Sequence, residues 1–260
     1  MAKKISAAWP RFSLSLSIAL ILLCAVAGIA AQKKNAAPSG SSLFAQDNGK
    51  LTIKLDGQTV GHEEFEITPS GGGWLAKGNA DIKPSSGPAS KVFGSLTLQP
   101  DGAPISYAWT AQAEKKNGAH ILFTNGIATM TLEMEGARPC TTDDIKDPNR
   151  TQPCFFEQSL SFNTPFIAVL DNNLYHQYAV LARFYDWSKR GAQTFPVLIP
   201  QELMTGSITV ESTGSAHLDG ASYQGLRVNT TDLEVDLFLD SNHRLMRLEV
   251  PAAKVSVVRD

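Results

Sequence analysis

The side chains best suited to chemistry lie in one stretch, between residues 171 and 189. Tyr175, His176 and Arg183 place a phenol, an imidazole and a guanidinium on a segment with helical spacing. Such groups supply the few polar contacts of an otherwise apolar ligand pocket. The stretch therefore predicts Tyr175, His176 and Arg183 as ligand-binding residues at the mouth of a pocket. In the competing interpretation Tyr178 and Tyr185 are core anchors and Arg183 pairs with an acid such as Asp186.

Sequence motifs for metal binding, phosphate binding and nucleophilic catalysis are absent or incomplete. The five histidines have no metal-ligand spacing, and no glycine-rich phosphate loop with Lys-Ser/Thr is present. Ser222 lies in a segment that approaches a nucleophile elbow, but the second glycine comes one residue late. We therefore predict no metal, no cofactor and no identified catalytic residue. Acidic groups such as Glu63, Glu64 and Glu66 are expected on a solvated strand face.

The N-terminal residues have the layout of a secretory signal peptide. Lys3, Lys4 and Arg11 precede an apolar run that ends in small residues at 27–31. The expected organisation is a signal peptide at 1–31, a flexible leader at 32–42 and a single β-rich domain at 43–260. The alternatives are an uncleaved membrane anchor and a lipoprotein at Cys24, which the bulky Leu23 disfavours.

Charge and cysteine content agree with export to the periplasm or the extracellular space. Without the signal, 20 basic residues face 25 acidic ones, a net charge near −5, which argues against nucleic-acid binding. Cys140 and Cys154 then form an even pair, most simply a disulfide that closes a polar loop at 140–154. Metal binding by the two thiols is the alternative.

Period-2 alternation predicts antiparallel strands along most of the domain. Apolar and polar residues alternate at 51–55, 96–99, 128–134 and 233–239. A switch of apolar phase at Gly61 predicts a β-bulge. Asx-Gly pairs predict hairpin turns; they are Asn48-Gly49, Asp56-Gly57, Asp101-Gly102, Asn117-Gly118, Asn125-Gly126 and Asp219-Gly220.

One segment does not show the period-2 alternation. Leu170, Leu174, Tyr178 and Leu181 recur at steps of three and four, which predicts a long helix over 171–189 with Asp171 as a possible N-cap. The expected fold is mainly β, of the α+β kind: a curled antiparallel β-roll or open barrel around one long helix. A closed lipocalin-like barrel and a β-sandwich are the alternatives.

Three segments resemble uncharacterised bacterial envelope domains. Residues 55–65 are similar to their opening strand pair, 95–104 to their second strand and turn, and 243–251 to their closing strand. Those domains are broadly similar to periplasmic lipoprotein-handling folds, and the resemblance implies a curled sheet around a helix. It transfers no catalytic residue, and the 140–154 loop is a departure from it.

Three functions are compatible with these features. The leading one is an exported, non-catalytic envelope protein that binds a lipid, another apolar or amphipathic molecule, or an envelope partner protein. The second is a secreted hydrolase or isomerase with its site at the helix 171–189. The third is a purely structural or interaction module, whose sign would be an exposed apolar strip on an edge strand.

Overall fold

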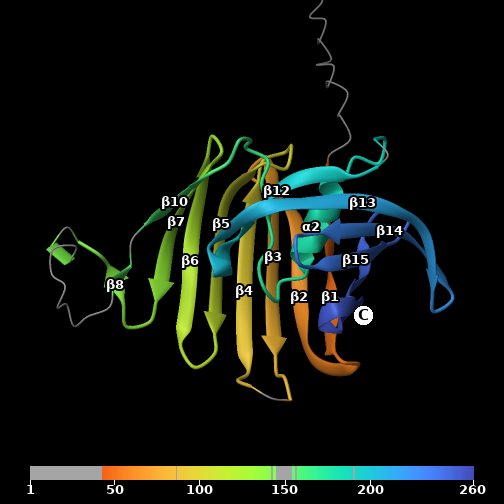
Figure 1. Cartoon of the computed structure of the whole chain (residues 1–260), viewed down its shortest axis with the longest axis horizontal. Coiled ribbons are helices and arrows are strands. Elements are labelled where there is room, and N and C mark those ends of the chain that lie inside the picture. Colours follow the sequence, from red (N-terminus) through yellow and green to blue (C-terminus); the bar gives the residue numbers. More distant parts are fainter. Residues whose placement is uncertain (1–42, 86, 142, 145–153, 156, 190) are drawn as a thin grey trace, which may run out of the picture. The chain divides into compact units, whose positions relative to one another are not determined.

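The computed structural model describes residues 43–85, 87–141, 143–144, 154–155, 157–189 and 191–260. The predicted signal peptide, the leader and most of the 140–154 loop lie outside these residues. The elements, labelled as in Figure 1, are β1 (Asp47–Leu55), β2 (Gln58–Ser70), β3 (Gly73–Ile82), β4 (Ser90–Leu98), β5 (Pro104–Gln112), β6 (Lys116–Thr124), β7 (Ile127–Met134), β8 (Arg138–Pro139), β9 (Cys154–Phe155), β10 (Gln158–Ser161), β11 (Ala168–Val169), α2 (His176–Phe184), β12 (Gln193–Ile199), β13 (Met204–Leu218), β14 (Ala221–Asn229), β15 (Glu234–Leu239), β16 (Leu245–Val250) and β17 (Val255–Arg259).

Fifteen strands form one curled, open sheet. Chain neighbours pair antiparallel from β1 to β7 and from β12 to β17, and β1 pairs with β17, which joins the two halves. The edges are β10, antiparallel to β7, and the short β11, parallel to β12. Figure 1 shows the sheet wrapping around α2. The predicted curled antiparallel sheet around a helix is confirmed, and the sheet is not closed.

The alternating pattern explains which face of each strand is buried. In β15, Val235, Leu237 and Leu239 are buried while the two intervening positions are half-buried. The predicted bulge is also present, because the β1–β2 register shifts where Ile53 faces Gly61 and Lys54 faces Thr59. Beyond this bulge, the inward side of β2 carries Phe65 and Ile67.

Four of the six Asx-Gly turns are confirmed. Turns occupy 56–57, 101–102, 125–126 and 219–220, but Asn48-Gly49 lies within β1 and Asn117-Gly118 within β6. The reason is packing across the sheet. A Cβ on Gly49 would lie 3.0 Å from the Arg259 guanidinium, and one on Gly118 would lie 2.6 Å from the Trp109 carbonyl oxygen.

The helix is shorter than the sequence predicts. Helix α2 spans His176–Phe184, nine residues, and the 171–189 boundaries are wrong at both ends. The chain before it belongs to the sheet, since β11 pairs with β12 and the Leu170 N–H donates to Leu198. Asp171 is not the N-cap: Tyr175 holds that position without a side-chain cap bond, and the Asp171 carboxylate binds Tyr107 and Gln201 instead.

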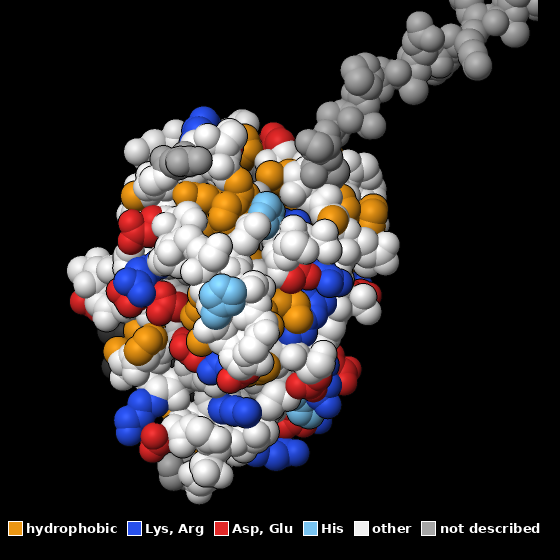
Figure 2. Space-filling model, turned by 90° about the vertical axis from the view of Figure 1, so that its right-hand side faces the viewer, with side chains coloured by type: hydrophobic (Ala, Val, Ile, Leu, Met, Phe, Trp, Pro, Cys, Tyr) orange, Lys and Arg blue, Asp and Glu red, His pale blue; other side chains and the backbone are white. Residues whose placement is uncertain are grey.

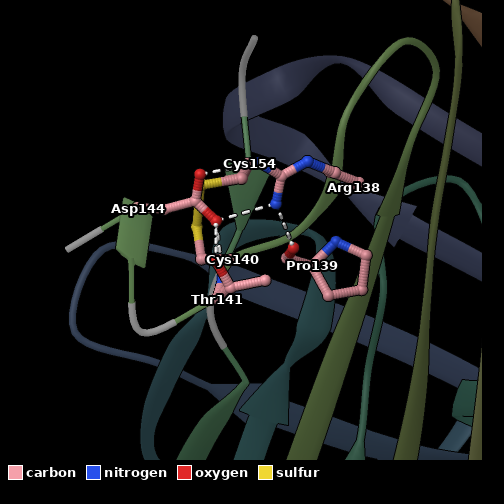
Figure 3. The surroundings of a disulfide bond; sticks show 6 residues. All are labelled: Arg138, Pro139, Cys140, Thr141, Asp144 and Cys154. Atoms are coloured by element: carbon pink, nitrogen blue, oxygen red, sulfur yellow. Dashed lines mark hydrogen bonds and ion pairs between the residues drawn. A yellow bond between two sulfur atoms is a disulfide. The ribbon is translucent and has the colours of Figure 1, made fainter. Parts of the chain in front are cut away.

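The predicted disulfide joins Cys140 and Cys154 (Figure 3). Beside it, the Arg138 guanidinium makes two bonds of 2.7 Å to the Asp144 carboxylate, which also accepts from the Thr141 N–H and hydroxyl. These donors hold the pKa of Asp144 well below its ordinary value. The ion pair and the disulfide therefore secure both ends of the loop to the parallel pair β8–β9.

Replacing both loop cysteines with serine is expected to lower the free energy of unfolding by about 3 kcal/mol. The crosslink joins positions 14 residues apart, and closing a loop of this size removes about that much chain entropy from the unfolded state. Urea unfolding of the two proteins measures the difference. A reducing agent should destabilise the native protein and leave the double variant unchanged; equal midpoints for all samples would contradict the prediction.

Candidate functional site

Buried polar groups gather where α2 meets the sheet. Glu63, from β2, and His176, the first residue of α2, have fully buried side chains. His176 Nδ1 lies 2.5 Å from Glu63 Oε1, and Glu63 Oε2 accepts from the main-chain N–H groups of Tyr175 (2.8 Å) and His176 (3.1 Å). A carboxylate from the sheet thus accepts from two backbone donors at the helix N-terminus that have no partner within the helix, a place where negative charge is favourable.

Two facing glycines make room for this arrangement. Gly78 of β3 pairs with Gly94 of β4 in the sheet register. A Cβ on Gly78 would overlap Glu63 Oε1 and His176 Nδ1, and one on Gly94 would lie 2.6 Å from Leu174 Cδ1. The absence of side chains at both positions lets the helix approach the concave face of the sheet.

A second buried network lies just before the helix. The Tyr107 hydroxyl donates to Asp171 Oδ2 (2.8 Å) and accepts from Gln177 Nε2 (3.0 Å), while the Gln201 N–H donates to Asp171 Oδ1 (2.8 Å). Burial raises the pKa of Asp171 to about 6, against the lowering effect of these hydrogen bonds. Burial, with the nearby Asp171, also raises the pKa of Tyr107 well above its ordinary value.

Asp171 is expected to make the protein less stable as the pH rises from about 4 to about 6. Its pKa is higher in the folded state than in the unfolded one, so the folded state binds more protons across this window. Stability from this group is complete below about 4 and is lost above the folded pKa, a change of up to about 3 kcal/mol. Urea unfolding at several pH values measures it.

The matched control for this pH dependence is Asp232, an exposed acid in the turn before β15. Asp171→Asn should remove the fall in stability between pH 4 and 6, whereas Asp232→Asn should keep it. An unchanged pH profile in Asp171→Asn would show that other groups cause the dependence.

The structure separates the three predicted ligand-binding residues. Tyr175 and His176 lie at the N-terminal end of α2, where burial raises the pKa of Tyr175 to about 12. Arg183 lies near the other end, in the last turn of the helix. His176 is sealed in the core, while Arg183 lines an open pocket. One site that contains all three is therefore not formed.

Two pockets adjoin at the C-terminal end of α2 and share Leu43 and Phe184. The first has a volume of about 490 Å³, and its polar lining includes Arg183, Asp186 and His243. The second, about 200 Å³, is mostly apolar and is lined by Leu43, Asp101, Phe166, Ala168, Phe184 and Phe195. Figure 2 shows hydrophobic side chains gathered beside a histidine near the upper end of one face, with mixed charges over the rest.

Aromatic rings form the walls of this end of the molecule. Phe184 lies 5.9 Å from Phe44 and 6.3 Å from Phe195 between ring centroids. Trp187 stacks on His243 with centroids 4.4 Å apart and planes 9° from parallel. Apolar walls with a few charged groups at the rim suit an amphipathic small molecule.

A histidine and a serine also meet on the β13–β14 hairpin. His217 Nδ1 lies 2.9 Å from the Ser222 hydroxyl, but both are exposed and directly opposite on the β13–β14 hairpin. Within the described residues, no three His, Cys, Asp or Glu side chains are grouped to hold a metal ion. In the same part of the chain, no helix is long and apolar enough to cross a bilayer.

Glu63 is a residue of the buried site that the sequence did not predict. It was expected on a solvated face with Glu64 and Glu66, and that expectation is wrong for Glu63 alone. The sequence does contain an indication that Glu63 is buried, because Glu63 alternates in step with the apolar residues Phe65 and Ile67 and therefore points to the same face of the strand. An acid on the inward side of a strand requires a buried partner.

Among solved structures, the chain is similar to a beta-barrel-like protein of the domain of unknown function DUF1849 from Brucella abortus. The TM-score is 0.50 at 8% sequence identity, over 83% of this chain and 94% of the other. A DUF1089 family protein from Pseudomonas aeruginosa gives a TM-score of 0.44 at 9% identity, over 74% and 90%. No family model and no curated protein sequence matches the chain. The first likeness shows the fold alone and agrees with the expected uncharacterised β domain; similarity to lipoprotein-handling folds stays a prediction.

Proposed function

We propose that this chain is an exported, non-catalytic protein that binds an apolar or amphipathic molecule at the open end of its curled sheet. The observation that carries the proposal is the aromatic pocket of Phe166, Phe184 and Phe195 beside the larger pocket at Arg183. Together their volumes fall in the range of small-molecule sites, and an exposed phenylalanine at the rim gives such a ligand an apolar entry.

Export is supported by two features. The N-terminal residues 1–31 have the composition of a signal peptide. The Cys140–Cys154 disulfide is typical of proteins that fold in an oxidising compartment. The proposal therefore places the domain in the periplasm or outside the cell.

The alternatives have less support. A hydrolase or isomerase built on His176 would need substrate access, but the side chains of His176 and Glu63 are both 0% exposed. An interaction module would use an apolar edge strand, whereas the exposed positions of β10 are Ser159 and Ser161. We therefore prefer ligand binding over both.

Phe166→Ser is expected to reduce ligand binding several-fold without affecting stability, because Phe166 lines the pocket and is 47% exposed. The measurement is native mass spectrometry and lipid extraction of protein purified from its own host. Leu122→Ser is the matched control, since Leu122 is 60% exposed on β6 and lines neither pocket. Native protein that is always empty, or equal ligand content in both variants, would contradict the proposal.

A further inference from the structure

Arg183 is a half-buried cation without an ion-pair partner in the described part of the chain. No carboxylate there lies within ion-pair distance of its guanidinium, which donates to the Asn242 carbonyl oxygen at 3.0 Å. Burial lowers its pKa from the ordinary value, although an arginine stays charged at every physiological pH. A half-buried cation without a counter-ion is costly unless a ligand supplies one.

The nearby acids do not fill this role. Asp240 already binds Arg244 at 2.7 Å, and Asp47 binds Arg259. Asp186, which lines the same pocket, binds Lys189 and the Ser188 hydroxyl. Each of these three acids thus has a basic partner of its own, and none of them neutralises Arg183 directly.

The apolar pocket begins at the next residue. Phe184 lines both pockets, and the smaller one continues along Phe166 and Phe195. A molecule that follows this wall would meet a cation at one end and aromatic rings at the other. The acidic group nearest to the apolar pocket is Asp101, which lines it and would disfavour an anion there.

We propose that the ligand is an anionic amphiphile, with an acidic head group bound by Arg183 and a hydrocarbon chain along Phe184 into the aromatic pocket. This inference rests on the proposed binding function and adds the charge and orientation of the ligand. A carboxylate is the simplest such head group, because the planar guanidinium matches it with two parallel hydrogen bonds.

The test compares decanoate with 1-decanol, which share a chain length and differ in head charge. Isothermal titration calorimetry gives the affinities. A change in tryptophan emission that Trp187→Phe removes reports the place of binding, because the Trp187 ring stacks on His243 in the larger pocket. A purely apolar site would prefer the alcohol, which water solvates less well. We expect decanoate to bind about tenfold more tightly or better.

Variants assign the head group to Arg183. Arg183→Gln should remove the preference for decanoate, and Arg183→Lys should keep part of it. Lys50→Gln, at an exposed cation that lines neither pocket, should leave it unchanged. Equal or tighter binding of 1-decanol by the native protein would overturn this inference and leave the binding function intact. Binding of neither probe would overturn both.

Discussion

Glu63→Ala is expected to lower the free energy of unfolding by about 3–5 kcal/mol. The Glu63 carboxylate accepts three hydrogen bonds, one from the His176 ring and two from the N–H groups that begin α2. The two bonds from His176 are buried and the one from Tyr175 is part-buried, so donors that lose this acceptor have little access to water. Each buried donor left without an acceptor costs about 1–3 kcal/mol, and the cavity left behind adds to the loss.

Urea unfolding measures the loss, and hydrogen exchange locates it. The amides of Tyr175 and His176 should exchange much faster in the variant, because Glu63 no longer holds them. Glu64→Ala is the matched control, since the next residue of β2 is exposed on the opposite face. A loss below about 1 kcal/mol, with unchanged exchange at the helix N-terminus, would show that α2 docks without this carboxylate.

Gly78→Ala is expected to lower the free energy of unfolding by about 3 kcal/mol. The added methyl group would overlap Glu63 Oε1 and His176 Nδ1, two buried atoms that bond each other. Overpacking of a close-packed core typically costs 1–3 kcal/mol, and displacement of a buried hydrogen bond raises the cost further. The reduced entropy of the unfolded chain returns less than about 1 kcal/mol.

A second glycine provides the control for this prediction. Gly206, in β13, is exposed, and a Cβ there would lie 3.8 Å from Val197 Cγ1, an ordinary contact. Gly206→Ala should therefore be close to neutral. In a Glu63→Ala background, Gly78→Ala should cost less than in the native protein, because one of the two overlapping atoms is gone. Strict additivity of the two substitutions would contradict the proposed clash.

Local patterns predicted the parts of the fold that depend on neighbouring residues. Alternation at 51–55 and 128–134 marked strands β1 and β7 because side chains of a strand point to opposite faces. The phase change at Gly61 marked the bulge for the same reason. The sole cysteine pair expected in the mature chain marked the disulfide.

Long-range packing decided what the sequence misassigned. Asn48-Gly49 has the chemistry of a turn but lies within β1, where Gly49 accommodates the Arg259 side chain from the far end of the chain. Asp171 has the chemistry of an N-cap but binds Tyr107, 64 residues away in the sequence. In both cases a tertiary contact outweighs a local preference worth about 1 kcal/mol.

For the candidate site, too, local patterns in the sequence predicted one part and long-range packing decided the other. The sequence alone determined that Tyr175, His176 and Arg183 share a helical segment, because their spacing is local. Only the tertiary structure decided that Glu63, 113 residues before His176, seals one end of that helix inside the sheet. The curl of the sheet buries His176 in the first turn, whereas Arg183 in the last turn lines a pocket. Contact between distant strands and a helix depends on how the whole sheet bends, and no short stretch of residues encodes that bend.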